Sequence, residues 1–132
     1  MLQKFFIETA SRNELQNIDY ELNMAIKNSG VKEGIAVVYC PHTTAGITIN
    51  ENGDPDVQRD MLLGLEKISP DRLEYRHFEG NSDAHIKSSI VGVSENILVV
   101  DGEPILGIWQ SLYFCEFDGP RRRHFYIKVV EG

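Results

Sequence analysis

The stretch Tyr39-Cys-Pro-His-Thr-Thr-Ala-Gly-Ile-Thr-Ile-Asn-Glu-Asn-Gly-Asp-Pro55 decides how this chain is interpreted, because it places reactive side chains inside an apolar alternation. Ala45, Ile47 and Ile49 recur with the two-residue period of a β-strand, so they are expected to face a core. The polar residues of opposite parity are His42, Thr44, Thr48 and Asn50. The pattern fits either a half-exposed strand or a strand that carries a functional site.

The length and charge of the chain limit what it can be. Its 132 residues fit one domain, 1–132, with a core of its own. A net charge of -7 argues against a broad nucleic-acid-binding surface, which is usually basic. The first residues lack the apolar run of a signal peptide, and no stretch approaches the ~20 apolar residues that span a bilayer. We therefore expect a cytoplasmic protein that contacts neither nucleic acid nor membrane, with Cys40 and Cys115 as reduced, buried thiols.

The remaining periodicities predict a single α+β domain in which a mostly antiparallel or mixed, sandwich-like sheet packs with about three helices. Strands are expected at 2–9, 34–40, 96–100, 104–117 and 122–130, in addition to the opening stretch. Helices are expected at 13–28, from Asp54 onward, and at 81–92. Residues 34–40 are apolar at both parities, which predicts a central strand covered on two sides.

Local signals set the predicted ends of these helices. Ser29-Gly30 would stop the first helix, and Asp54-Pro55 would begin the second with Asp54 as N-cap. Ser82 or Asp83 would cap the third helix and Gly92 would close it. The buried stripe of the second helix would be Val57, Met61, Leu62 and Leu65. Residues 68–80 are polar and predict a loop that is either functional or plain surface.

Two further segments contain side chains that are suited to catalysis or to anion binding. In the third helix, His85 shares one side with Ser88 and Ser89. After the turn Asp118-Gly-Pro, alternation places Arg121 and Arg123 with the core-facing residues of the last strand and Arg122 with His124 and Lys128. We therefore expect Arg121 and Arg123 to hold a phosphate, whereas a belt of surface ion pairs would use all three arginines alike.

Three segments together resemble the YjbQ-like family, whose members carry the name secondary thiamine-phosphate synthase enzyme. They are 42–55, Ser82-Asp-Ala-His-Ile-Lys-Ser-Ser89, and Gly107-Ile-Trp-Gln110 with Glu116-Phe-Asp-Gly-Pro-Arg121. The resemblance covers essentially the whole chain. Ile108 departs from it, because the family often has Thr at this position.

The resemblance implies a YjbQ-like fold, a homotrimer, and the joining of a pyrimidine diphosphate to a thiazole phosphate with loss of pyrophosphate. The alternative is a trimeric protein that binds a small phosphorylated metabolite without turning it over. A purely structural role, in which the polar residues only join subunits, predicts no ligand. An acid or base group placed to act on the bound ligand would distinguish the enzyme from the binding protein.

The candidate site residues fall into three sets. The catalytic candidates are His42, His85, Glu51 and Glu116. The substrate and phosphate candidates are Thr43, Thr44, Asn52, Lys87, Ser88, Gln110, Arg121 and Arg123. The metal candidates are His42, His85, Asp54 and Asp118.

The identity of a divalent metal stays open at this point. A departing pyrophosphate favours Mg²⁺ held by carboxylates, whereas two imidazoles with a carboxylate favour Zn²⁺ with one open position. His42 and His85 are expected to converge in space. Tyr113, Phe117 and Tyr126 are expected to leave apolar surface for the trimer.

Overall fold

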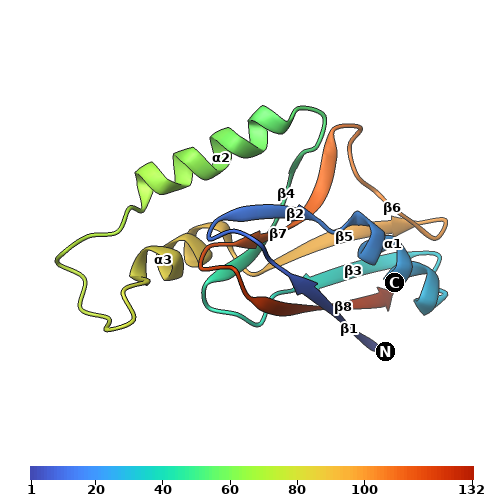
Figure 1. Ribbon diagram of the computed structural model, residues 1–132. Coiled ribbons are helices and arrows are strands. Elements are labelled where there is room, and N and C mark those ends of the chain that lie inside the picture. Colours follow the sequence, from blue (N-terminus) through green and yellow to red (C-terminus); the bar gives the residue numbers. More distant parts are fainter.

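Eight strands in two antiparallel sheets and three helices make up the computed structural model, which describes residues 1–132 (Figure 1). In spatial order, the five-stranded sheet contains β1 (Leu2–Glu8), β8 (Arg122–Glu131), β3 (Gly34–Tyr39), β5 (Ser94–Val100) and β6 (Glu103–Pro104). The three-stranded sheet contains β2 (Glu14–Asn17), β7 (Gln110–Glu116) and β4 (Ala45–Glu51). The helices are α1 (Asp19–Ser29), α2 (Pro55–Ile68) and α3 (Ser82–Val91). The predicted α+β class and the three helices are confirmed.

The main core lies between the two sheets and α1. The predicted inward residues Ala45 and Ile47 of β4 are fully buried there, together with Phe125 and Ile127 of β8. The strand that is covered on both faces is β7, in which every residue from Ser111 to Glu116 is buried. The prediction that 34–40 is such a strand is wrong.

In β3, alternate residues are buried and exposed. Ala36 and Val38 are fully buried, whereas Ile35 and Tyr39 are 42% and 46% exposed. The apolar residues on this second face are covered by no other element of the chain. A sequence pattern records only that a face is apolar, so it does not distinguish a covered face from a bare one.

The predicted helix at 13–28 begins too early. Residues 14–17 form β2, which pairs with β7, and α1 begins only at Asp19. Leu15 and Ile18 have helical spacing, but pairing with a buried strand overrides so short a signal. The predicted end is confirmed, since Gly30 has a φ of 69° and closes α1.

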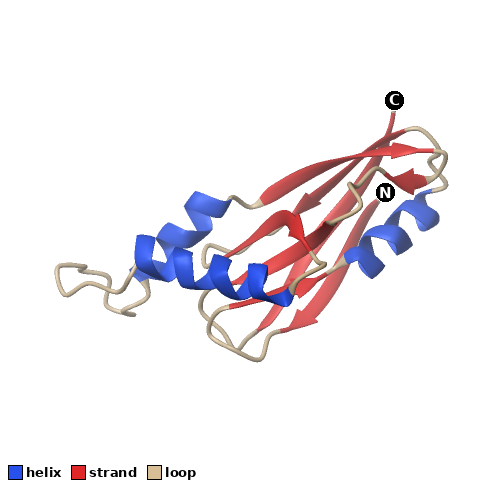
Figure 2. Cartoon of the chain, turned by 90° about the horizontal axis from the view of Figure 1, so that it is seen from above, coloured by secondary structure: helices blue, strands red, loops and turns tan.

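The helix α2 begins as predicted. The Asp54 side chain accepts a hydrogen bond of 2.9 Å from the Asp56 amide, and Pro55 follows at the first position. The predicted apolar stripe faces the body of the protein, but none of its residues is buried. Figure 2 shows α2 and α3 near one end of the sheets and α1 near the other, with residues 69–81 looping outward beyond α3.

The helix α3 ends at Gly92 as predicted, but its predicted caps are wrong. Asn81 occupies the N-cap position without a side-chain cap, and Asp83 is fully buried. The predicted strand 104–117 is also divided, because β6 ends at Pro104 and β7 begins at Gln110. The hairpin at Asp101-Gly102 that joins β5 to β6 is confirmed. None of the three helices is long and apolar enough to cross a membrane.

Candidate functional site

Two adjoining cavities open at the end of the molecule where β3 leads into β4 and where α3 and β8 approach each other. We name the first the arginine chamber; it has a volume of about 370 Å³ and includes Thr44, His77, Asn81, Arg121 and Arg123 in its wall. We name the second the serine chamber; it has a volume of about 540 Å³ and includes Tyr39, Cys40, Ser88, Ser89 and Val93. Pro41, His42, Thr43 and His85 line both. The expected convergence of His42 and His85 is confirmed.

Three of the four histidines of the chain line these cavities, and the fourth, His124, packs against His42. The rings of His42 and His124 meet edge to face with centroids 4.8 Å apart. The rings of His77 and His85 form a second edge-to-face pair at 5.4 Å. The four residues come from the β3–β4 connection, β8, the loop before α3, and α3, so only tertiary folding brings them together.

The His42 ring is fixed by the main chain of β8. Its Nε2 lies 3.0 Å from the carbonyl oxygen of His124 and 3.1 Å from the His124 amide nitrogen. Nδ1 is therefore the ring nitrogen that remains for a ligand. Burial, followed by the charges of Arg123 and His124, lowers the pKa of His42 below its ordinary value. His42 is thus neutral at pH 7 and suited to accept a proton or bind a cation.

Arg123, which lines the arginine chamber, forms a buried ion pair with Glu116. The Arg123 guanidinium donates to both carboxylate oxygens of Glu116, with Nε 2.8 Å from Oε1, and Nη2 donates over 2.9 Å to the Thr44 hydroxyl. Glu116 also accepts hydrogen bonds from the Thr9 hydroxyl at 2.7 Å and the Asp118 amide at 3.0 Å. Burial alone would raise the pKa of Glu116, but these hydrogen bonds hold it below its ordinary value. Glu116 is therefore a fixed anion that positions Arg123.

Arg121 belongs to a second, more exposed pair. Its Nη2 donates over 2.8 Å to Oδ2 of Asp118, which also accepts a 2.7 Å hydrogen bond from the Asn81 side chain. Burial opposes ionisation of Asp118, but Asn81, Arg121 and Arg12 together lower its pKa. Nη1 of Arg121 and Nη1 of Arg123 make no hydrogen bond within the chain. These two groups are the donors that the chamber offers to an anion.

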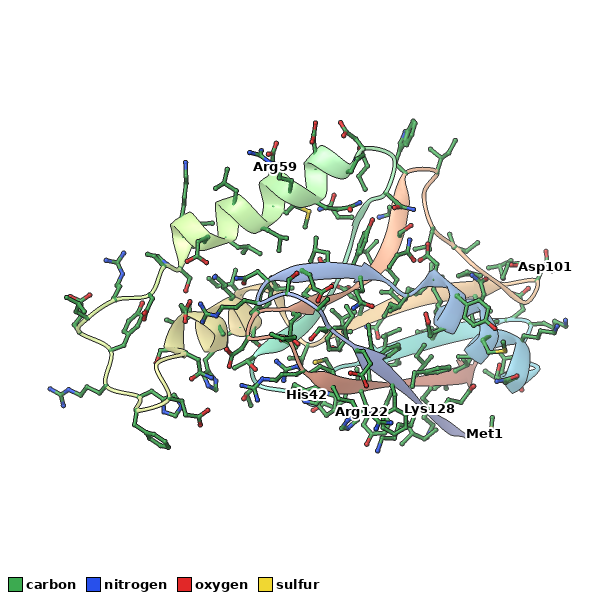
Figure 3. All side chains as sticks on the ribbon, in the orientation of Figure 1. Met1, His42, Arg59, Asp101, Arg122 and Lys128 are labelled. Carbon is green, nitrogen blue, oxygen red and sulfur yellow. The ribbon has the colours of Figure 1, made fainter.

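The three consecutive arginines divide as the strand alternation predicted, although Arg121 precedes β8. Arg121 and Arg123 line the arginine chamber, whereas Arg122 lines neither cavity. Arg122 instead lies 4.8 Å from the centroid of the Phe6 ring and 3.7 Å from Glu8, on the outer face of the five-stranded sheet. Figure 3 shows His42 and Arg122 on the side of the molecule opposite Arg59 of α2.

The third helix supplies His85 and two serines to the cavities, but Lys87 lies elsewhere. Lys87 is 1% exposed, and its ammonium group bonds to Glu66 of α2 and lies 3.9 Å from Asp83. It lines neither cavity, so the predicted phosphate contact is wrong for the isolated chain. The Ser88 hydroxyl donates to the carbonyl of Ala45 over 2.7 Å, which anchors α3 to β4.

Four predicted site residues lie at the far end of β4 and β7, away from His42. They are Glu51, Asn52, Asp54 and Gln110, and none lines either cavity. The seven residues of β4 separate the two ends by roughly 20 Å. Glu51 pairs with Gln110 across the sheet, and Tyr113 donates to the Glu51 carbonyl over 3.1 Å. Asp54 caps α2, so these residues build the β4–α2 corner.

The expected metal set does not assemble in one chain. No three or more His, Cys, Asp or Glu side chains lie close enough together to hold a metal ion. His42 and His85 are two ligands of the right type, but Asp118 is engaged by Asn81 and Arg121. Protein zinc sites generally use three or four protein ligands. The side chains of one chain therefore do not form the expected metal site.

Cys40 sits in the wall of the serine chamber, yet its thiol is 1% exposed. Burial is the main cause that raises its pKa to about 11. The expectation of reduced, buried thiols is confirmed for Cys40 and for Cys115.

Sequence reasoning assigned no role to several residues that line the cavities. His77, Glu79 and Asn81 come from the loop before α3, and Tyr39 and Val93 come from apolar segments. His124 lies on a strand face that alternation directs away from the core. The one available signal was the small number of histidines, all of them in polar segments or beside arginines.

Comparison with other proteins assigns the chain to a family. Residues 3–132 match the family model described as UPF0047 protein YjbQ-like. This chain is a member of the YjbQ-like family. The UPF0047 protein MJ1081 of Methanocaldococcus jannaschii is 55% identical over 130 residues, which are 98% of this chain and 94% of that protein. The UPF0047 protein YugU of Bacillus subtilis is 51% identical over 98% of this chain and 99% of its own length.

Solved structures of YjbQ-like proteins have the same fold. The protein of this family from Clostridium acetobutylicum superposes with a TM-score of 0.95 at 48% identity, covering 97% of this chain and 99% of that one. A YjbQ-like protein from Sulfolobus solfataricus superposes with a TM-score of 0.94 at 26% identity, covering 100% and 97%. The predicted family and α+β fold are therefore confirmed.

Proposed function

We propose that this protein binds a small phosphorylated metabolite in the cleft formed by the two cavities, with the phosphate in the arginine chamber. The observation that carries the proposal is the convergence of two arginines and three histidines on one chamber whose wall, apart from Pro41, is entirely polar or charged. Guanidinium groups bind phosphate oxygens with bidentate geometry, and imidazole N–H groups can donate further hydrogen bonds to them. Three hydroxyl and amide side chains in the same wall add further hydrogen-bonding groups: Thr43, Thr44 and Asn81.

The resting chamber has little positive charge to spare for a ligand, because Glu79 also lies in its wall and both arginines are paired with carboxylates. Glu116 neutralises Arg123, and Asp118 neutralises Arg121, so only the unbonded Nη1 groups and the imidazoles remain for a ligand. A leaving pyrophosphate carries more charge and requires a cation such as Mg²⁺. The binding of a monophosphate is thus supported more directly than the loss of pyrophosphate.

Within this proposal, the thiamine-phosphate synthase reaction is the enzymatic candidate, with thiazole phosphate in the cleft and Mg²⁺ arriving with the pyrimidine diphosphate. Neutral His42 is the proposed acid–base group, because its Nδ1 has no partner in the chain and its pKa is lowered. Capture of a phosphorylated metabolite without turnover is the alternative. Both share the same binding step.

The test is calorimetric titration of inorganic phosphate and thiazole phosphate into the parent protein and two arginine variants. Arg121→Ala is expected to weaken both ligands at least tenfold, because it removes a charge-assisted contact worth about 1.5–3 kcal/mol. Arg122→Ala is the matched control and should change neither affinity by more than twofold. Equal losses in the two variants, or no binding to the parent protein, would refute the proposal.

Turnover is measured with the same proteins. Release of pyrophosphate from the two synthase substrates, with Mg²⁺ and without it, separates the enzyme from the binding protein. Metal analysis of the purified protein then reports whether an ion accompanies His42 and His85. Binding of thiazole phosphate without any pyrophosphate release would support the non-catalytic alternative.

A further inference from the structure

Two buried charges of α3 join α2 to the connection between β1 and β2. Lys87 and Asp83 are at most 1% exposed, and the Lys87 Nζ lies 3.9 Å from Oδ2 of Asp83. Lys87 also bonds to Glu66 of α2, and Asp83 accepts a 3.2 Å hydrogen bond at Oδ1 from Arg12. Arg12 lies between β1 and β2. Buried charges are screened little by salt, so each of these groups responds to a change in its neighbour.

Arg12 continues this series of contacts to the arginine chamber. Its Nε lies 3.8 Å from Oδ1 of Asp118, and its carbonyl accepts a 3.0 Å hydrogen bond from the Gly119 amide. Asp118 holds Arg121 through its other carboxylate oxygen, over 2.8 Å. Three carboxylates and three cations therefore alternate between α2 and the chamber wall. In order, they are Glu66, Lys87, Asp83, Arg12, Asp118 and Arg121.

One atom in this series is free to take a new partner. Oδ2 of Asp83 is buried and accepts no hydrogen bond, although the Lys87 ammonium group is 3.9 Å away. A buried acceptor without a partner costs free energy, so Lys87 is expected to bond to Asp83 whenever Glu66 releases it. Asp83 then depends less on Arg12, and Arg12 can approach Asp118 more closely.

We infer that Arg12 is a positioning residue that couples α2 to phosphate binding. Asp118 offers one negative charge to two guanidinium groups, so a closer Arg12 leaves more of the Arg121 charge uncompensated and available to an anion. The inference rests on the proposed phosphate site and deepens it, because it adds regulation of that site from α2. Loss of the Glu66 charge should strengthen phosphate binding, whereas loss of Lys87 or Arg12 should weaken it.

The experiment titrates inorganic phosphate calorimetrically into the parent protein and into Glu66→Gln, whose side chain is 46% exposed and so accessible to substitution. Glu66→Gln is expected to bind phosphate roughly threefold more tightly, within the range by which substitutions change the coupling between two sites. Asp60→Asn is the matched control. It removes the same charge from α2, but Asp60 pairs only with Arg59, outside the series. Asp60→Asn should leave the phosphate affinity unchanged.

A double-mutant cycle separates the series of contacts from a direct effect of charge. In an Arg12→Gln background the series is interrupted, so Glu66→Gln should no longer change the phosphate affinity. A direct electrostatic effect of Glu66 would persist there, because it does not pass through Arg12. If urea titrations show that Arg12→Gln does not fold, Lys87→Met provides the second background, since it interrupts the series at another contact and keeps an unbranched, apolar side chain.

Three results would overturn the coupling while leaving the phosphate site intact. They are equal affinities in the parent protein and Glu66→Gln, an equal gain in Glu66→Gln and Asp60→Asn, and a gain that survives in the double variant. Failure of inorganic phosphate to bind the parent protein would instead refute the proposed function on which the coupling depends.

Discussion

At the scale of single residues, the buried pair of Glu116 and Arg123 links stability to the site. Both side chains are at most 6% exposed, and the fork of Arg123 continues to Thr44 at the start of β4. Removing one partner of such a pair costs about 3–5 kcal/mol, because the other charge stays buried without compensation. Replacing either partner is therefore expected to destabilise the protein, whether or not Glu116 contacts a substrate.

The lowered pKa of Glu116 predicts a specific dependence of stability on pH. A carboxylate whose pKa is lower in the folded protein stabilises it above the unfolded pKa of about 4.3, and this contribution is lost as the pH falls through the folded value. The free energy of unfolding from urea titrations should thus drop more steeply below pH 4.3 in the parent protein than in Glu116→Gln. Asp118 titrates in both proteins and cancels in the comparison. Parallel curves for the two proteins would contradict this assignment.

Strand parity predicts only part of the site at the scale of single residues. Alternation alone separated Arg122 from Arg123, because strand parity is a local property. It could not show that Glu116 and Arg123 would form an ion pair, since that contact depends on β7 and β8 meeting in space. Nor could it show that Asp54 and Glu51 lie far from His42, because a list of polar residues does not record at which end of β4 a site forms.

At the scale of elements, the strand and helix types with strong periodicity were predictable, and the packing between them was not. The alternation along β8 and the N-cap of α2 at Asp54 depend only on adjacent residues. The short β2 has only four residues and depends on β7 for its hydrogen bonds. The bare outer face of β3 depends on where the helices pack. Both features depend on tertiary packing, so the local sequence pattern does not predict them.

The contact between β4 and α3 gives a prediction at this scale. An added Cβ at Gly46 would lie 2.6 Å from the Gly92 carbonyl oxygen, where the end of α3 crosses the strand. Gly46→Ala must therefore separate the two elements and shift His85, so we expect at least 2 kcal/mol of destabilisation and weaker phosphate binding. Chemical denaturation and calorimetry measure the two effects.

Gly64→Ala is the matched control, because a Cβ there meets nothing within 4 Å in the interior of α2. It should stabilise the protein by up to about 1 kcal/mol, since alanine favours the helix, and leave phosphate affinity unchanged. A stable Gly46→Ala protein with normal binding would show that the β4–α3 contact does not position the site.

At the scale of the whole molecule, the outer face of the five-stranded sheet carries exposed apolar side chains that no other part of the chain covers. In register, Ile35 lies opposite both Leu98 and Val130, and the three side chains are 42%, 60% and 48% exposed. Phe6 and Tyr39 extend this apolar surface. Tyr113 and Phe117, which were expected to be exposed, are buried instead.

Apolar surface of this kind is typical of an interface between copies of a chain, so a homotrimer remains our expectation and this sheet face its proposed contact. Tyr39 lies on this face and also in the wall of the serine chamber, so a neighbouring copy seated here would narrow the opening of the cleft.

Native mass spectrometry of the parent protein should give three times the mass of the chain, and Leu98→Glu should give the monomer. Leu63→Glu, on the exposed side of α2 at 46% exposure, is the control that should stay trimeric. A monomeric parent protein at micromolar concentration would refute the assembly, and a trimeric Leu98→Glu would place the interface on another face.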